Sequence, residues 1–259
     1  MFKNAIVRTP GRSIVKGLCN SKNLGLPNYE RAIIQHQSYI DALAKCGLDV
    51  LVLESSEAYP DSTFVEDVAL ITPNCAILTR PGAPSRRGEV HEIESVIKQK
   101  FNNIEHIVAP GAIEGGDIMM VGDHYYIGLS ERTNLEGAKQ IIQILNKYGM
   151  SGSTIALKKA LHLKTGLSYL EENNLVVCGE FINDSSLAQY NAIEIPEEES
   201  YAANCIWINE SVIIPLGYPT TKQRIKDAGY AVVETDVSEF QKLDGGLSCL
   251  LYTSPSPRD

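Results

Sequence analysis

The chain has 259 residues, of which 44% are hydrophobic and 21% are charged, and its formal net charge is −9. This composition is typical of a globular protein and excludes a disordered or fibrous chain. No apolar run approaches the roughly 20 residues of a membrane span, and the acidic charge argues against a partner nucleic acid. The six cysteines are scattered and follow no export signal, which indicates reduced thiols in a cytoplasmic protein.

Pairs of apolar runs joined by a short polar turn recur along the chain and predict β-hairpins. The paired runs are Val68–Ile71 with Cys75–Leu78, Ile118–Val121 with His124–Ile127, a run before Asn173-Asn174 with Leu175–Cys178, and Cys205–Ile208 with Val212–Ile214. Their turn residues Asn74, Asp123, Asn174 and Glu210 follow one another at intervals of 49, 51 and 36 residues.

Helical patterns lie between these hairpins, and a further strand follows most of them. The predicted helices are Tyr29–Cys46, Glu89–Phe101, Asn134–Tyr148 and Pro219–Ala228. Three of them stop at a glycine (Gly47, Gly149 and Gly229), the residue that most readily adopts the left-handed cap conformation. The strands predicted after helices are Asp49–Leu53, Ile104–Val108 and Tyr230–Glu234.

The recurring unit of strand, hairpin and helix spans roughly 50 residues, which favours a closed, propeller-like array of units that cannot bury their apolar faces alone. The alternative is a generic α/β domain with several hairpins. No linker divides the chain, so residues 1–251 are predicted to form one domain. Leu18–Pro27 is a small, polar loop of the kind that covers a site, or a plain surface connection. The tail Tyr252–Asp259 is predicted to be disordered.

Cys249 and His162 are candidates for thiol chemistry. Two glycines shortly before Cys249 would let the backbone approach a ligand closely, although a buried structural cysteine is the plainer interpretation. His162 lies between two leucines, as core histidines often do, but a cysteine nucleophile needs an acid–base partner elsewhere in the chain. No His-Glu-x-x-His helix, P-loop or dinucleotide fingerprint is present, so neither a zinc site of that kind nor a nucleotide is indicated.

Carboxylates and arginines in four other segments would suit a zwitterion with a planar cationic head. Asp61, Glu66 and Asp67 surround Phe64, an arrangement that fits a guanidinium group, and Glu114 and Asp117 flank a glycine pair. Arg86-Arg87 and Arg132 could clamp a carboxylate. Turn-forming acids and solvated surface arginines are the alternative interpretation of the same residues.

Several long segments, taken in order, resemble the dimethylarginine dimethylaminohydrolase family of the guanidino-modifying, or pentein, superfamily. They are FVEDVAL, TRPGAPSRRGE, EGGDIMMVGDHYYIG, RTNLEGA, HLKTGLSYL, IPEEESYAANCIWIN and DGGLSC. The resemblance covers nearly the whole chain up to Cys249 and is strongest to the bacterial form. It implies an α/β fold, a five-bladed pseudo-symmetric propeller around a central channel, in agreement with the repeat.

The same resemblance implies roles for single residues. Cys249 is the nucleophile, His162 is the general acid and base, and Glu114 orients them or holds the substrate. The implied substrate-binding residues are Asp61 and Asp67 for the guanidinium, Arg86 and Arg132 for the carboxylate, Leu18 in the lid, and Leu243 through its carbonyl.

The implied reaction is hydrolysis of N-omega-methylated arginines to citrulline and a methylamine through a covalent thiouronium on Cys249. No metal or organic cofactor is implied, and a homodimer is expected. Arginine or agmatine deiminases are the sibling alternative, but related deiminases keep an acid two residues after the histidine, where this chain has Lys164. A non-catalytic binding protein and a purely structural α/β protein are the alternatives from other classes. The tail YTSPSPRD does not look like family sequence.

Overall fold

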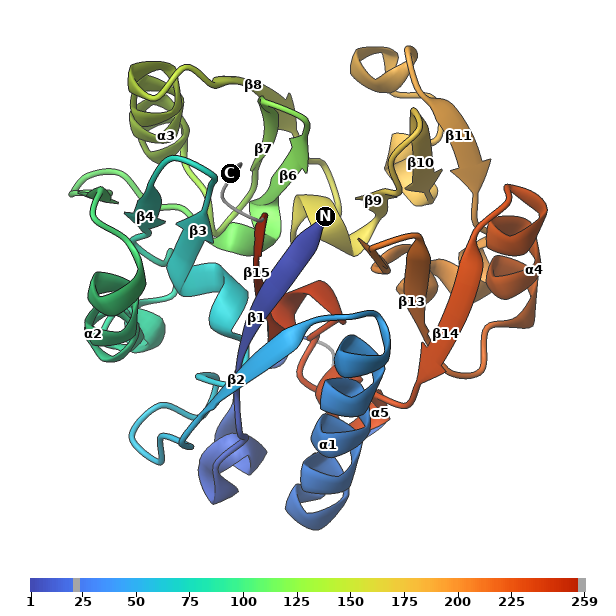
Figure 1. The fold of residues 1–259 in the computed structure, drawn as a ribbon, viewed down its shortest axis with the longest axis horizontal. Helices are drawn as coiled ribbons and strands as arrows, with labels where there is room; N and C mark the ends of the chain where they lie inside the picture. Colours follow the sequence, from blue (N-terminus) through green and yellow to red (C-terminus); the bar gives the residue numbers. More distant parts are fainter. Residues whose placement is uncertain (21–23, 256–259) are drawn as a thin grey trace.

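In the computed structural model, which describes residues 1–20 and 24–255, the strands form five three-stranded sheets. Figure 1 shows these sheets arranged around a common centre, with the long helices on the outside and the N-terminus near the middle. A central cavity is lined by the first strand of four sheets and, in the fifth, by Tyr252 of β15 (Tyr252–Pro255). The predicted five-bladed α/β propeller is therefore confirmed.

Four of the sheets share one strand pattern, an antiparallel hairpin followed by a third strand parallel to its second. In chain order they are β3 (Ala69–Ile71), β4 (Ala76–Leu78) and β5 (Ile104–His106); β6 (Ile118–Val121), β7 (His124–Leu129) and β8 (Ser151–Ala156); β9 (Leu167–Tyr169), β10 (Asn174–Val177) and β11 (Asn191–Glu194); β12 (Ile206–Ile208), β13 (Ser211–Pro215) and β14 (Ala231–Thr235). A parallel pair needs a long crossover. Helices α2 (Glu89–Lys100), α3 (Leu135–Lys147) and α4 (Pro219–Asp227) supply three of these crossovers.

The remaining sheet joins the two ends of the chain. β1 (Phe2–Arg8) pairs in parallel with β2 (Asp49–Leu53) across helix α1 (Tyr29–Lys45), and antiparallel with β15 (Tyr252–Pro255). The expectation of a disordered tail is therefore wrong for its first four residues, while residues 256–259 lie outside the described part. The tail has little strand character of its own, but the edge of β1 offers backbone N–H and C=O groups with which it can pair.

Turn chemistry agrees with the sequence at the hairpins and helix ends. Gly47, Gly149 and Gly229 have φ values of 87°, 78° and 97°, the left-handed conformation predicted for a glycine that follows a helix. Asn209 and Glu210 have φ values of 47° and 77°, which matches the two left-handed positions of a type I′ hairpin turn. These conformations depend on residues that are close together in the chain, so they could be predicted without long-range contacts.

Apolar side chains fill the spaces between neighbouring blades and hold the ring together. One such cluster joins the β3–β5 and β6–β8 sheets through Ile77, Ile113, Ile127 and Ile141, all fully buried. A short helix, α5 (Ser238–Gln241), leads from the last blade toward β15. Among the described residues, no helix has both the length and the apolar character needed to cross a membrane. Of the predicted lid loop, residues 21–23 lie outside the described part.

Candidate active site

The same local feature recurs at one end of each blade. A short 3-10 turn precedes the cavity-lining strand of every sheet: Val65–Val68, Gly115–Asp117, Leu163–Thr165, Glu197–Ala203 and Ser248–Leu250. Cys249 lies within one of these turns, and Glu114 and His162 immediately precede two others. Because the blades surround one axis, equivalent positions of the repeat converge there, and residues far apart in the sequence form one site.

A single pocket at this end contains ten of the eleven site residues that the sequence predicts. They are Leu18, Asp61, Phe64, Asp67, Arg86, Glu114, Arg132, His162, Leu243 and Cys249. The structure therefore brings together the thiol, the imidazole, three carboxylates and two guanidinium groups. Charged groups in that number are rarely buried together unless they compensate one another.

Glu66 is the exception, because it lines the central cavity and does not line this pocket. Its carboxylate forms an ion pair with Lys164 and accepts a hydrogen bond from the Ser248 hydroxyl at 3.0 Å. Glu66 and Asp67 are neighbours in a tight 3-10 turn, where successive side chains point in different directions. Glu66 and Asp67, although adjacent in the sequence, thus line two different cavities.

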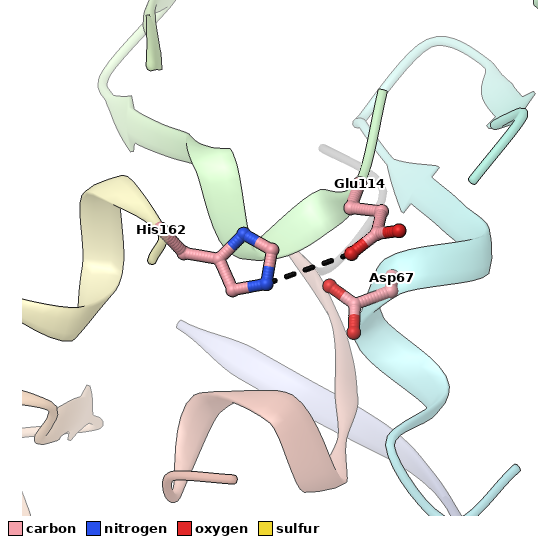
Figure 2. A group of neighbouring side chains, drawn as sticks. All are labelled: Asp67, Glu114 and His162. Atoms are coloured by element: carbon pink, nitrogen blue, oxygen red, sulfur yellow. Dashed lines mark ion pairs between the residues drawn. The ribbon is translucent and has the colours of Figure 1, made fainter. Parts of the chain in front are cut away.

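Asp67, Glu114 and His162 form the ionised centre of the pocket (Figure 2). His162 Nε2 lies 3.5 Å from Glu114 Oε2, and one Asp67 oxygen accepts a hydrogen bond from the Gly116 amide at 2.9 Å. Burial alone would raise the pKa of Asp67, but Arg86 and protonated His162 outweigh it and hold that pKa below its usual value. Glu114 has the opposite shift, since burial and then the charge of Asp67 raise its pKa.

Asp117 orients His162 from the other side, a role that the sequence did not reveal. Its fully buried carboxylate lies 3.2 Å from His162 Nδ1 and accepts hydrogen bonds from Ser130 Oγ and Thr133 Oγ1 at 2.7 and 2.6 Å. Burial would lower the pKa of His162, yet its surrounding carboxylates, Asp117 first, raise it to about 9. The imidazole is therefore a protonated acid at neutral pH.

Cys249 shares two cavities with His162, the pocket itself and a smaller space beside it. Its sulfur accepts a hydrogen bond from the Gly246 amide at 3.5 Å. Burial, followed by the negative charges of Asp67 and Glu66, raises the pKa of the thiol to about 12. Without a bound cation, the sulfur is therefore a neutral thiol and not a thiolate.

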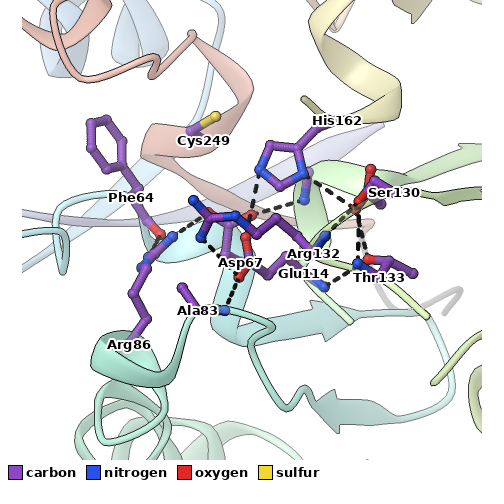
Figure 3. A network of polar contacts seen from close by, with 12 residues as sticks. Phe64, Asp67, Ala83, Arg86, Glu114, Ser130, Arg132, Thr133, His162 and Cys249 are labelled. Atoms are coloured by element: carbon purple, nitrogen blue, oxygen red, sulfur yellow. Dashed lines mark hydrogen bonds and ion pairs between the residues drawn. The ribbon is translucent and has the colours of Figure 1, made fainter. Parts of the chain in front are cut away.

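The two arginines of the pocket differ in how they are held (Figure 3). Arg132 is 19% exposed at its side chain and lies 3.7 Å from Glu114, so part of its side chain remains accessible to a ligand. Arg86 is buried and donates to Asp67 at 2.5 Å and to Glu89 at 2.8 Å. Arg132 is thus the more accessible of the two anion-binding groups.

The apolar and lid residues close the pocket around the charged groups. The Leu18 amide donates to Asp61 Oδ1 at 2.8 Å, so the described part of the loop is tied to a carboxylate of the site. Burial raises the pKa of Asp61. Phe64 packs edge-on against Phe240 with ring centroids 6.3 Å apart, and the space beside its ring is so tight that only glycine fits at position 245.

The donor set of Asp67, Glu114 and His162 has its ligand atoms within 4.8 Å of one another and could in principle hold a metal ion. However, Arg86 pairs with Asp67, Arg132 lies against Glu114, and His162 is held protonated. A metal ion needs neutral imidazole and free carboxylates. These compensating cations make the cluster better suited to acid–base chemistry on an organic cation.

Comparison with known proteins places this chain in one family. The family model for N,N dimethylarginine dimethylhydrolase of eukaryotes matches residues 21–253. The N(G),N(G)-dimethylarginine dimethylaminohydrolase of Pseudomonas aeruginosa is 57% identical over 251 residues, which cover 96% of this chain and 98% of that protein. The chain belongs to the dimethylarginine dimethylaminohydrolase family. It is a hydrolase of the dimethylargininase class.

Further members and their structures agree with this assignment. The Streptomyces coelicolor N(G),N(G)-dimethylarginine dimethylaminohydrolase is 30% identical, over 96% of this chain and 95% of its own length. The solved C249S mutant of the P. aeruginosa enzyme, complexed with citrulline, superposes with a TM-score of 0.96 at 56% identity, over 98% of this chain and 99% of that one. An H162G adduct with S-methyl-L-thiocitrulline also has a TM-score of 0.96 at 56% identity, over 98% and 100% of the two chains.

Proposed function

We propose that this protein hydrolyses N-omega-methylated arginines to citrulline and dimethylamine or methylamine, with Cys249 as nucleophile and His162 as general acid and base. The observation that carries the proposal is the pocket in which Cys249 and a protonated histidine share walls with two arginines and with the carboxylates of Asp61, Asp67 and Glu114. The solved relatives with citrulline and S-methyl-L-thiocitrulline support it.

The charges of the pocket match those of a methylated arginine. Asp61 and Asp67 supply negative charge for the guanidinium, and Arg132 supplies a partly open guanidinium for the α-carboxylate. Leu18 and Leu243 line the same pocket, where a lid and a backbone carbonyl can hold the α-amino end. A substrate that lacks the carboxylate, such as agmatine, would leave Arg132 without a partner.

Binding of the cation would also activate the nucleophile. The resting thiol has a pKa of about 12 because it is buried beside negative charges. A guanidinium held next to the sulfur by Asp67 reverses the sign of the local charge, so the thiol loses its proton to solvent more easily. Substrate binding and thiolate formation are thus coupled, which limits reaction of the free enzyme with other electrophiles.

In the first half-reaction, the Cys249 sulfur attacks the guanidinium carbon and forms a carbon–sulfur bond. His162, protonated at the start, gives its proton to the departing amine, and the carbon–nitrogen bond breaks. The products are free dimethylamine, a neutral imidazole and a thiouronium on Cys249. Glu114 and Asp117 stabilise the imidazolium beforehand and fix its orientation from both ring nitrogens.

In the second half-reaction, water attacks the thiouronium carbon while neutral His162 takes one of its protons. The carbon–sulfur bond then breaks, the sulfur leaves as thiolate, and the second proton is released as the urea group of citrulline forms. Because His162 alternates between acid and base, both steps use the same imidazole. No oxyanion develops in the first step, so a site lined with carboxylates is appropriate.

Product analysis tests the proposal. Purified protein is offered asymmetric dimethylarginine, monomethylarginine, arginine and agmatine in parallel, with Cys249→Ser as the control. The expected result is citrulline plus the methylamine from the first two substrates, weak reaction with arginine, and no turnover by the variant. Ammonia from arginine or agmatine as the main product would instead assign the chain a deiminase activity. Ligand binding without turnover would leave a binding protein.

A further inference from the structure

The Arg86 guanidinium is held by the protein itself to an unusual degree. Its Nε donates to the Glu89 carboxylate, Nη1 donates to Asp67 at 2.5 Å, and Nη2 donates to Glu89 and to the Phe64 carbonyl, both at 2.8 Å. Among the described residues, these bonds engage four of the five N–H groups that arginine carries. Arg86 therefore cannot grip a substrate carboxylate with two parallel hydrogen bonds.

Glu89 holds Arg86 in this position from behind the pocket. It is the first residue of helix α2 and is 3% exposed, and both of its carboxylate oxygens accept hydrogen bonds from Arg86. Arg86 lies in the pocket wall, while Glu89 is not among the described residues that line the pocket. A carboxylate so deeply buried is retained only where its charge is compensated, and here the compensation is Arg86.

The charges of Asp67, Arg86 and Glu89 together determine how strongly Asp67 attracts a cation. Arg86 alone would neutralise Asp67, and that carboxylate would then attract a substrate cation only weakly. With Glu89 on the other side of the guanidinium, the group of three carries one net negative charge. Asp67 is the negatively charged member of this group that lines the pocket, close to Glu114 and His162.

We propose that Glu89 is a positioning residue for cation recognition: it saturates Arg86, fixes Asp67 through it, and preserves the negative charge that Asp67 presents to the substrate guanidinium. The inference rests on the proposed function and extends it to a residue that does not touch the substrate. It also leaves Arg132 as the main contact for the α-carboxylate.

The protonation of Glu89 gives this arrangement a pH dependence. Burial raises the pKa of Glu89 to about 7, Arg86 opposes that shift, and Asp61 and Asp67 add to it. The phenol of Tyr252, in β15, also faces this group. Below pH 7 Glu89 becomes neutral, Arg86 then compensates Asp67 alone, and affinity for a cation falls. A neutral ligand of the same shape is not subject to this loss.

The test compares a cationic ligand with a neutral one in the full chain. Calorimetry at pH 8 measures dissociation constants of asymmetric dimethylarginine and citrulline for Cys249→Ser protein, with and without Glu89→Gln. We expect E89Q to weaken the dimethylarginine complex about tenfold and the citrulline complex by less than about twofold. E92Q is the matched control, since Glu92 lies on the same helix but pairs with Arg8 at 3.2 Å and Ser56 at 2.8 Å.

Equal weakening of both ligands would show a merely structural role, and no change for either would also overturn the proposal. Failure of the Cys249→Ser protein itself to bind either ligand would contradict the proposed function instead. If E89Q does not fold, the unsubstituted site provides the second measurement. The dissociation constant of dimethylarginine divided by that of citrulline must then rise several-fold when the pH is lowered from 8 to 6. A constant ratio refutes the inference.

Discussion

Replacement of Asp117 by asparagine tests how the pocket keeps His162 protonated. Asp117 Oδ2 lies 3.2 Å from His162 Nδ1, and among the contributions that raise the pKa of His162 to about 9 those of Asp117 come first. Loss of an opposite charge in direct contact lowers a pKa by about 1–3 units. Asp117→Asn should therefore bring the pKa of His162 to about 7, at the middle of that range.

The magnitude follows from the fraction of His162 that remains an acid. At pH 8 a group with a pKa of about 9 is about nine-tenths protonated, and one with a pKa of about 7 is about one-tenth protonated. The first half-reaction needs the imidazolium, so kcat at pH 8 should fall about tenfold in Asp117→Asn. At pH 6 both forms are mostly protonated, and the difference should largely disappear.

The assay is the pH dependence of citrulline formation between pH 5.5 and 10. The basic limb of kcat should move down by about 1–3 units in the variant. Asp123→Asn, an exposed carboxylate in the turn of the same β6–β7 hairpin, serves as the control and should keep the original limb. A basic limb in Asp117→Asn that coincides with that of the unsubstituted enzyme would refute the assignment of Asp117. Thermal unfolding verifies that the variant is folded.

Three further outcomes are expected. The folded-state pKa of His162 is raised from 6.5 to about 9. Its protonation therefore contributes at most about 3 kcal/mol to the free energy of unfolding, a contribution that is complete below pH 6.5 and lost as the pH rises through 9. Urea unfolding of the unsubstituted protein and of His162→Gln across that pH range measures it. Arg132→Lys should raise KM for dimethylarginine about tenfold with kcat little changed, because lysine lacks the planar fork; steady-state kinetics decide this, and an unchanged KM would contradict it. Gly245→Ala should abolish activity and cost about 1–3 kcal/mol or more by overpacking, since its Cβ would lie 2.1 Å from a Phe64 ring carbon, whereas Gly122→Ala, in open space at φ +58°, should cost about 1 kcal/mol and stay active.

Local features of the fold could be predicted from the sequence because they depend on residues that are close together in the chain. The glycines after α1, α3 and α4 adopt the left-handed conformation that they were expected to adopt. The hairpin turn at Asn209-Glu210 forms as predicted. The spacing of about 50 residues corresponds to one blade and predicted the closed array.

Much of the candidate site could also be predicted, through the resemblance of whole segments to one family. Ten of the predicted residues line one pocket. Their roles, together with the homodimer and the cytoplasmic location, stay predictions. Without the resemblance, the sequence left Cys249 and His162 open between thiol chemistry and a structural role in the core, because nothing local marks a buried thiol as reactive.

Only the tertiary structure decided the features that depend on contacts between distant segments. β15 forms because β1, more than 240 residues away, has an edge to pair with, and the tail's own composition does not indicate a strand. Glu66 and Asp67 separate because a 3-10 turn points adjacent side chains into different cavities. Asp117 and Glu89 act through His162 and Arg86, and such partnerships are set by packing around the axis. Sequence patterns predict local structure because they involve residues a few positions apart. Charge compensation in a buried site depends instead on which blades pack against one another.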